Sequence, residues 1–242
     1  MALAGDHVRV LVDGYELTGD SNRVTVDAKR DLPEQTVFLD RVHNFLPGQR
    51  VSNVEHVGFL NAAVARSHPV LRANTLEGIF AVLLGQNADP VVGDPVYMLD
   101  GLQGGYSTLP EVAKVIPFTA KFANRGGRGG WGVALAVPMT FTNSSNGSSV
   151  DNSAASSNGG AAFLHILQAA ASDTYAITVE GSTTGAFGGE ESTLATFTLD
   201  ASALGSERIA IAGSVPRYTR WKAVRTGSAG NTVEIAVHLV RF

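Results

Sequence analysis

The sequence predicts an all-β protein with one helix, in which a β-sandwich or barrel is followed by a β jelly-roll sandwich. Apolar and polar residues alternate almost one by one in residues 217–225 and again in 232–240, which is the pattern of strands with one buried face. Small residues dominate, with 27 glycines among 242 residues, and this fits short strands joined by frequent turns. Short apolar segments at even spacing in the second half complete the evidence.

The composition excludes several classes of protein. With 44% apolar and 17% charged residues, the chain can bury a large core and is not disordered. Its formal net charge of −4 is spread over both halves, so neither half has the basic footprint of a nucleic-acid-binding protein. There is no cysteine for a disulfide or a thiolate metal site. No apolar run approaches the roughly 20 residues of a membrane span, and we expect no membrane partner and no secretory signal.

The first half begins with two expected strands, at residues 8–12 and 22–26, separated by a tight turn. The alternation fails in residues 27–50, where charged residues are interleaved with Phe, Leu and Pro. So long a polar stretch is either a functional loop or a solvated surface loop. Strand character returns in residues 51–60.

Residues 74–85 give the expected helix. Asn74 can cap its start, Glu77 lies in the first turn where the helix dipole favours an anion, and Gly85 ends it. Apolar side chains recur at helical spacing and form one stripe: Leu76, Ile79, Phe80, Leu83 and Leu84. We expect this helix to cover one face of a sheet.

Two further strands, at residues 95–99 and 115–122, lead to the expected domain boundary. Residues 125–130 read Arg-Gly-Gly-Arg-Gly-Gly, which predicts a flexible linker or a hairpin turn. The segment lacks the Gly-Lys-Ser/Thr ending of a phosphate-binding loop. We therefore divide the chain into residues 1–130 and a separately folding unit, residues 131–242.

The second half consists of short strands at even spacing, which predicts a jelly-roll sandwich. The last two expected strands alternate around a turn at residues 226–231, which predicts an antiparallel hairpin. The expected strands are residues 131–137, 139–142, 161–168, 175–181, 194–199, 207–212, 218–225 and 232–241.

Residues for catalysis, metal binding or cofactor binding are not recognisable in the sequence. The six histidines form no metal-binding motif, and no nucleophile motif appears around the serines. We expect no catalytic residue, no metal and no cofactor, and we do not expect an enzyme. Phe187, Tyr218 and Trp221 could form a sugar-stacking face on the jelly roll, although buried aromatic residues are the commoner use.

The order and spacing of these signals resemble the tail tube (major tail) proteins of long-tailed bacteriophages. The second half is similar to jelly-roll segments appended to phage virion proteins, so the two resemblances cover nearly the whole chain. The segments that carry the first resemblance are 13–19, 36–40, Phe45-Leu46-Pro47-Gly48, 54–61, the single helix and 117–126, and those that carry the second are 158–166 and 213–220.

The resemblance implies a structural virion protein that is assembled in the host cytoplasm and becomes part of the tail. Its first domain is expected to join its sheet to those of neighbouring copies, as a ring of six, while the arm at residues 27–50 reaches the next ring. The arm contacts would involve Phe38, Phe45, Leu46 and Pro47. The expected partners are further copies, other tail proteins and DNA passing through the lumen without specific binding.

An adhesin that binds host-surface carbohydrate, or a virion decoration protein, is the alternative from another class. In that case the jelly roll would supply the function, and the first domain would only anchor it. Rings or tubes in electron micrographs would distinguish the tube protein from a monomeric lectin.

Overall fold

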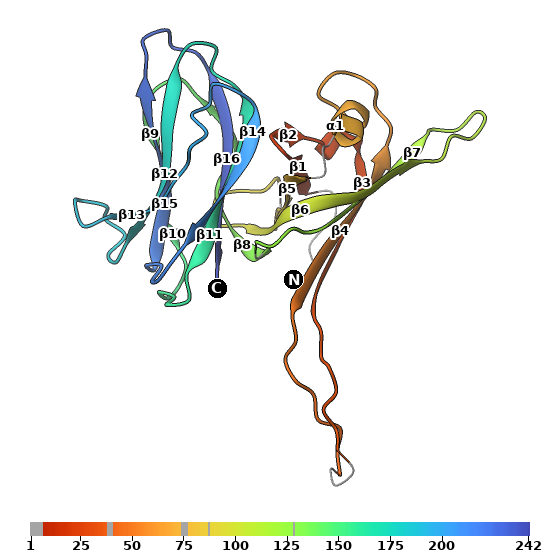
Figure 1. Cartoon of the computed structure of the whole chain (residues 1–242). Helices are drawn as coiled ribbons and strands as arrows, with labels where there is room; N and C mark the ends of the chain where they lie inside the picture. The colour runs from red at the N-terminus through yellow and green to blue at the C-terminus, as the bar shows by residue number, and fades with distance from the viewer. Residues whose placement is uncertain (1–6, 38–40, 74–76, 87, 128) are drawn as a thin grey trace.

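The computed structural model describes residues 7–37, 41–73, 77–86, 88–127 and 129–242. Over these residues it confirms an all-β fold with one short helix, arranged as a curled antiparallel sheet and a second sheet (Figure 1). The elements of the first half are β1 (Val8–Val12), β2 (Tyr15–Glu16), η1 (Thr18–Asp20), β3 (Ser21–Arg30), β4 (Arg50–Phe59), α1 (Ser67–Ala73), β5 (Glu77–Leu84), β6 (Pro95–Thr108) and β7 (Pro117–Asn124). Those of the second half are β8 (Gly130–Phe141), β9 (Ser145–Asn146), β10 (Val150–Asp151), β11 (Gly160–Gln168), β12 (Thr174–Ser182), β13 (Ser192–Thr196), β14 (Gly205–Ile211), β15 (Tyr218–Thr226) and β16 (Val233–Arg241).

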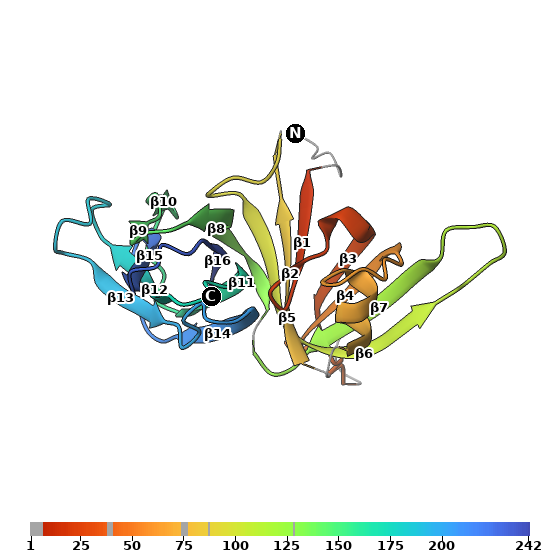
Figure 2. The same ribbon diagram turned by 90° about the horizontal axis from the view of Figure 1, so that it is seen from above.

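The first half is a sheet that curls around an apolar core, here called the inner core. The strand order is β1-β5-β6-β7-β4-β3, with every neighbouring pair antiparallel. Figure 2 shows β1 and β5 on one side of this curl and β3, β4 and β7 on the other, with α1 at its open side. The inner core consists of Val10, Val12, Leu17, Val54, Leu71, Phe80, Val82, Tyr97, Leu99, Phe118, Ala120 and Phe122.

The second half has the strand order of a jelly roll. One sheet runs β14-β11-β16-β8 and the other β10-β15-β12-β13. Apart from the hairpin β12–β13, consecutive strands from β10 to β16 lie in opposite sheets, and this alternation is the jelly-roll connection. Between the sheets lies the jelly-roll core, which includes Leu135, Leu164, Tyr175, Val179 and Trp221.

A third core, here called the junction core, joins the two halves. It places β1, β5 and β6 against the outer face of β11 and β16, and is made of Leu11, Ile79, Ala81, Leu83, Val96, Met98, Ala161, Phe163, Ala236 and Val240. The described strands therefore stack in four layers: β3-β4-β7, then β1-β5-β6, then β8-β16-β11-β14, then the second jelly-roll sheet. The face of β3-β4-β7 that is turned away from the inner core lies at the far end from the jelly roll (Figure 1).

The predicted helix at residues 74–85 is wrong where the structure describes it, because residues 77–84 form strand β5. Asn74, Thr75 and Leu76 lie outside the described residues. Strand β5 is buried on both faces, since Phe80 and Val82 enter the inner core while Ile79, Ala81 and Leu83 enter the junction core. A strand covered on both sides is apolar at nearly every position, so periodicity alone cannot distinguish it from a helix. The α-helix of the described chain is α1, with Pro69 in its first turn, where proline is tolerated.

The predicted C-terminal hairpin is also wrong. Strand β15 pairs with β12, whereas β16 pairs with β11 and β8 in the other sheet. The connection between them crosses the end of the sandwich and is held by Asp173, whose carboxylate accepts hydrogen bonds from the backbone of Ala229 (3.2 Å) and Asn231 (2.9 Å).

The glycine-rich segment at 125–130 is a packed crossing rather than a free linker in its described residues. The backbone N–H of Arg125 donates a hydrogen bond to the backbone carbonyl oxygen of Asp100 (2.9 Å), and Gly130 already belongs to β8. A Cβ atom at Gly127 would lie 2.9 Å from the Arg208 guanidinium, and one at Gly129 would lie 2.6 Å from the Met98 carbonyl oxygen. Strand β8 then pairs with β6 on one side and β16 on the other, so one sheet continues through the expected boundary.

Candidate assembly surfaces

The four-stranded unit β6-β7-β4-β3 has an unpaired edge at each end among the described residues. The outer edge of β3 is one, because β3 pairs only with β4 over Ser21–Arg30. The other belongs to the far part of β6. Its register with β5 ends at Leu102, and beyond that point only β7 pairs with it. Unpaired edges offer rows of backbone donors and acceptors that a second strand can join.

The two edges run in opposite directions. Strand β6 is antiparallel to β7, β7 to β4 and β4 to β3, so β3 points opposite to β6. When copies are related by rotation about a common axis, corresponding strands keep their direction. The β3 edge of one copy then meets the β6 edge of the next in the antiparallel sense. Such a head-to-tail contact generates a closed ring when the rotation closes.

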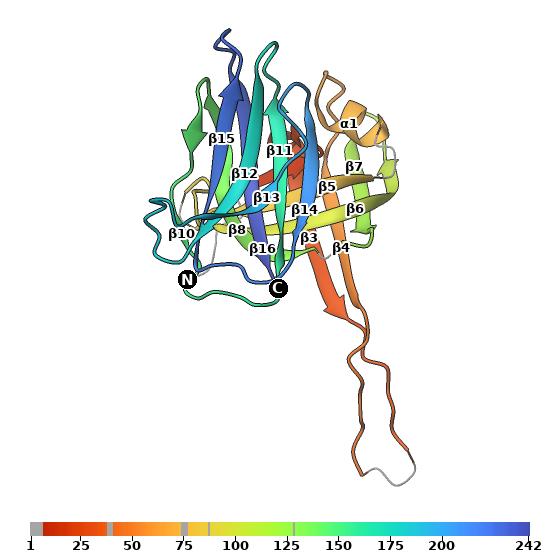
Figure 3. The same ribbon diagram turned by 60° about the vertical axis from the view of Figure 1, so that its left-hand side comes forward.

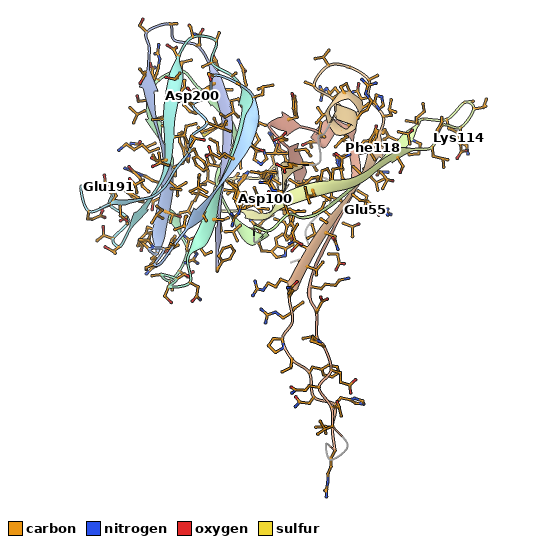
Figure 4. The ribbon with its side chains drawn as sticks, viewed as in Figure 1. Glu55, Asp100, Lys114, Phe118, Glu191 and Asp200 are labelled. Atoms are coloured by element: carbon orange, nitrogen blue, oxygen red, sulfur yellow. The ribbon has the colours of Figure 1, made fainter. Side chains whose placement is uncertain are left out.

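The sheet face of β3-β4-β7 opposite the inner core is polar, and we call it the polar face. Glu55 lies at its centre, on the opposite side of the sheet from the buried Phe118 (Figure 4). Its carboxylate lies 3.1 Å from Arg23 on β3 and 3.7 Å from Lys121 on β7. Lys29 pairs with Asp27 at 3.2 Å. Arg23 and Lys121 therefore share one carboxylate of the polar face, and Lys29 has another.

The arm is an extension of the β3–β4 hairpin far beyond the body of the protein (Figure 3). Backbone hydrogen bonds continue along it, from Asp31 to Gln49 (2.9 Å) and from Leu46 to Pro33 (2.9 Å). Glu34 accepts hydrogen bonds from Thr36 and His43, both at 2.5 Å, and these bonds lower the pKa of its carboxyl group. The expected loop is thus a two-stranded ribbon held by its own backbone.

The predicted arm contacts lie on this ribbon where they are described. Phe45 is 51% exposed and Leu46 is 46% exposed, and Pro47 is exposed as well. Phe38 lies outside the described residues. The contacts of these side chains with another subunit remain a prediction, because a single chain carries none.

The three predicted sugar-facing aromatic residues do not form one surface. Trp221 is 1% exposed and belongs to the jelly-roll core, where its ring packs 5.4 Å from that of Phe141. It faces inward because its neighbours Arg220 and Lys222 take the outward positions and pair with Glu180. Phe187 and Tyr218 are half-buried, with the guanidinium groups of Arg220 (4.2 Å) and Arg217 (4.9 Å) over their rings.

Three histidines, His56, His165 and His238, are buried, but they are not grouped with other metal-ligating side chains in the part of the chain that the structure describes. His56 packs between the rings of Phe80 and Phe118, and burial lowers its pKa to about 4. His165 and His238 lie on the strand faces turned to the junction core, with ring centroids 6.1 Å apart. Burial lowers the pKa of His165 to about 3 and that of His238 well below 6.5. Among the described residues no group of three or more His, Cys, Asp or Glu is placed to hold a metal ion.

The free part of β6 was missed from sequence because the strand was expected to end at residue 99. Residues 101–108 read Gly-Leu-Gln-Gly-Gly-Tyr-Ser-Thr, and glycine is unfavourable inside a strand. The sequence carries no positive signal for this part of the strand, because residues 101–108 do not alternate between apolar and polar side chains. Among the described residues no helix is long and apolar enough to cross a membrane.

No protein-family model matches the sequence, and no curated protein does so either. Solved structures with a similar fold include a chain of the virion of a native gene transfer agent particle (12% identity, TM-score 0.44, 54% of this chain and 98% of that one). The cap that terminates the tube of the anti-feeding prophage is another (10% identity, TM-score 0.43, 55% and 93%). The Dit protein of phage SPP1 matches over 97% of this chain and 99% of its own (10% identity, TM-score 0.34). All three TM-scores lie below 0.5, and we draw no functional argument from them.

Proposed function

We propose that this chain is a structural protein of a phage or phage-like virion, and that it polymerises as stacked rings into the tail tube through which the genome passes. The observation that carries the proposal is the pair of free edges on the four-stranded unit β6-β7-β4-β3. Because the edges run in opposite directions, rotation-related copies extend one antiparallel sheet into a closed barrel.

The order of layers supports an orientation for each copy. The polar face and the jelly roll lie at opposite ends of the stack of sheets. Copies in a ring have the least space near the axis. We therefore place the single sheet that carries the polar face at the bore and the larger jelly roll at the outside. In this arrangement residues 131–242, the jelly roll, form the outer surface of the tube.

The charges of the polar face fit a bore for DNA. A bare lysine or arginine would hold a phosphate through counterion release. Here Arg23 and Lys121 share the carboxylate of Glu55, and Lys29 pairs with Asp27, so none of these three cations is bare. DNA would therefore pass without specific binding, and the arm, with Phe45 and Leu46 exposed, would reach the next ring.

Electron microscopy of the purified chain tests the proposal. The expected result is rings with a central hole, or tubes of stacked rings, at protein concentrations above the assembly threshold. Isolated particles of one chain at all concentrations would contradict it and favour the adhesin or decoration protein. Light scattering on the same samples provides the mass of the particles and serves as the control for staining artefacts.

A further inference from the structure

The hairpin between β6 and β7 ends in a tip, residues 109–116, that projects on the side away from the jelly roll (Figures 2 and 4). Its apolar side chains are strongly exposed: Leu109 is 63%, Val112 is 97% and Val115 is 67% exposed. Exposed apolar residues gathered on one projecting element commonly mark a contact site.

The tip carries no net charge. Glu111 and Lys114, the charged residues of 109–116, form an ion pair with each other. A partner for this element should therefore be apolar and uncharged at the point of contact, unlike a nucleic acid or an anionic membrane.

The same chain carries a small apolar surface of this kind, the loop 62–65 before α1. It reads Ala-Ala-Val-Ala, its residues are exposed, and Val64 is 92% exposed. The base of the loop is fixed at the start of β3, because the Asp20 carboxylate accepts hydrogen bonds from the side chain of Asn61 (3.0 Å) and the backbone of Ser67 (2.9 Å). The loop thus stands at the Ser21 end of the β3 edge.

The antiparallel contact between copies brings these two elements together. When β3 of one copy pairs with β6 of the next, the Ser21 end of β3 lies beside the Thr108 end of β6. The tip continues past Thr108 and therefore reaches the loop 62–65. We propose that the tip at residues 109–116 of each copy docks on the loop 62–65 of the adjacent copy in the ring; this contact rests on the proposed ring.

A cross-linking experiment on the full chain tests the contact. The protein has no cysteine, so the double variant Val64→Cys, Val112→Cys carries two thiols that a short bis-maleimide can bridge. The expected result is a ladder of covalent oligomers on a denaturing gel. The matched control Val64→Cys, Val224→Cys, whose second site is 45% exposed on the jelly roll, should give no ladder.

The outcomes separate the contact from the ring itself. Rings in micrographs without a ladder would overturn the docking of the tip and leave the ring in place. A wild-type chain that never forms rings would overturn the proposed function and the docking with it. As an independent readout, Val112→Asp should raise the concentration for half-assembly by roughly tenfold or more, as expected for an apolar interface anchor, while Val224→Asp should leave it unchanged.

Discussion

Glu55 determines the charge of the polar face. Its carboxylate is shared by Arg23 and Lys121, which lie on the two strands that flank β4. Its side chain is 35% exposed, so the pair energies are small in water. We therefore expect Glu55 to affect the binding of charged molecules to the polar face more than the stability of the fold.

Replacing this carboxylate should turn the polar face into a polyanion-binding surface. In Glu55→Gln, Arg23 and Lys121 lose their partner and can contact phosphate or sulfate groups. We expect later elution from a heparin column, with a steep dependence on salt. The control Glu111→Gln makes the same change of net charge at the hairpin tip. Equal elution of the two variants would show that the arrangement of charges on the polar face does not matter.

The buried histidines make stability depend on pH. His56 and His165, with pKa values of about 4 and 3, and His238, whose pKa is also lowered, bind protons in the unfolded chain near pH 6.5 but not in the folded one. The free energy of unfolding is therefore unaffected by the titration of these groups above pH 6.5, and it decreases as the pH falls from 6.5 towards 4. Each group accounts for about 1.4 kcal/mol per pH unit in that window.

Urea unfolding at pH 7 and pH 5 measures this effect. The midpoint should fall clearly at pH 5, and the fall should be smaller in His238→Leu, which removes one of the three groups. An equal fall in the variant would show that another group causes the pH dependence. Leucine replaces an imidazole whose nitrogens are buried and unpaired, so the variant should fold.

At the scale of elements, the positions of several strands were predicted from sequence, whereas the strand character of β5 and the sheet to which β16 belongs were not. Strands β1, β4 and β11 lie close to their predicted positions. Strand β5 was taken for a helix because two different cores bury its alternate residues. The same double burial of β16 hid its membership of a sheet other than that of β15.

The functional elements could be predicted only in part. The arm stood out because its length and polarity with exposed-looking aromatic residues are unusual. The relative direction of the two free edges depends on three strand pairings, and one of them joins β4 to β7, which lie far apart in the sequence, so no local pattern shows it. The inward side of Trp221 was likewise set by the register of β15 with β12.

The arm should be needed for stacking but not for folding. In the double variant Phe45→Ser, Leu46→Ser, the arm keeps its backbone hydrogen bonds, while its exposed apolar side chains are lost. We expect unchanged thermal unfolding and single rings instead of tubes in micrographs. The control Leu204→Ser, Val224→Ser changes two residues of similar exposure on the jelly roll. Normal tubes from the arm variant would contradict the proposed role of Phe45 and Leu46 in stacking.

At the scale of the whole molecule, the junction core binds the two halves to each other. The sequence suggested a jelly roll that could be removed, whereas the structure buries Leu11, Leu83 and Met98 against it. A chain ending near Thr142 would expose this apolar surface and leave β8 without β16. We expect it to be insoluble or aggregated, as judged by size-exclusion chromatography. A soluble, cooperatively folding fragment would instead show that residues 1–142 are independent of the jelly roll.

The number of subunits that we expect in the proposed ring depends on how many four-stranded units each chain contributes to the barrel. The jelly-roll order of the second half leaves one unit, β6-β7-β4-β3, in the described chain. By the resemblance to single-domain tube proteins, we expect that closing the proposed barrel takes six copies. Two such units per chain would take three copies.

Charge-detection mass spectrometry of isolated rings tests the central claim most directly. Each chain has a mass of 25.3 kDa, and we predict a closed species of six chains, with sixfold rotational symmetry in end-on micrographs. A ring of three chains would show that the second half also contributes strands to the barrel wall. A chain that stays monomeric at every concentration would contradict the edge-to-edge ring altogether.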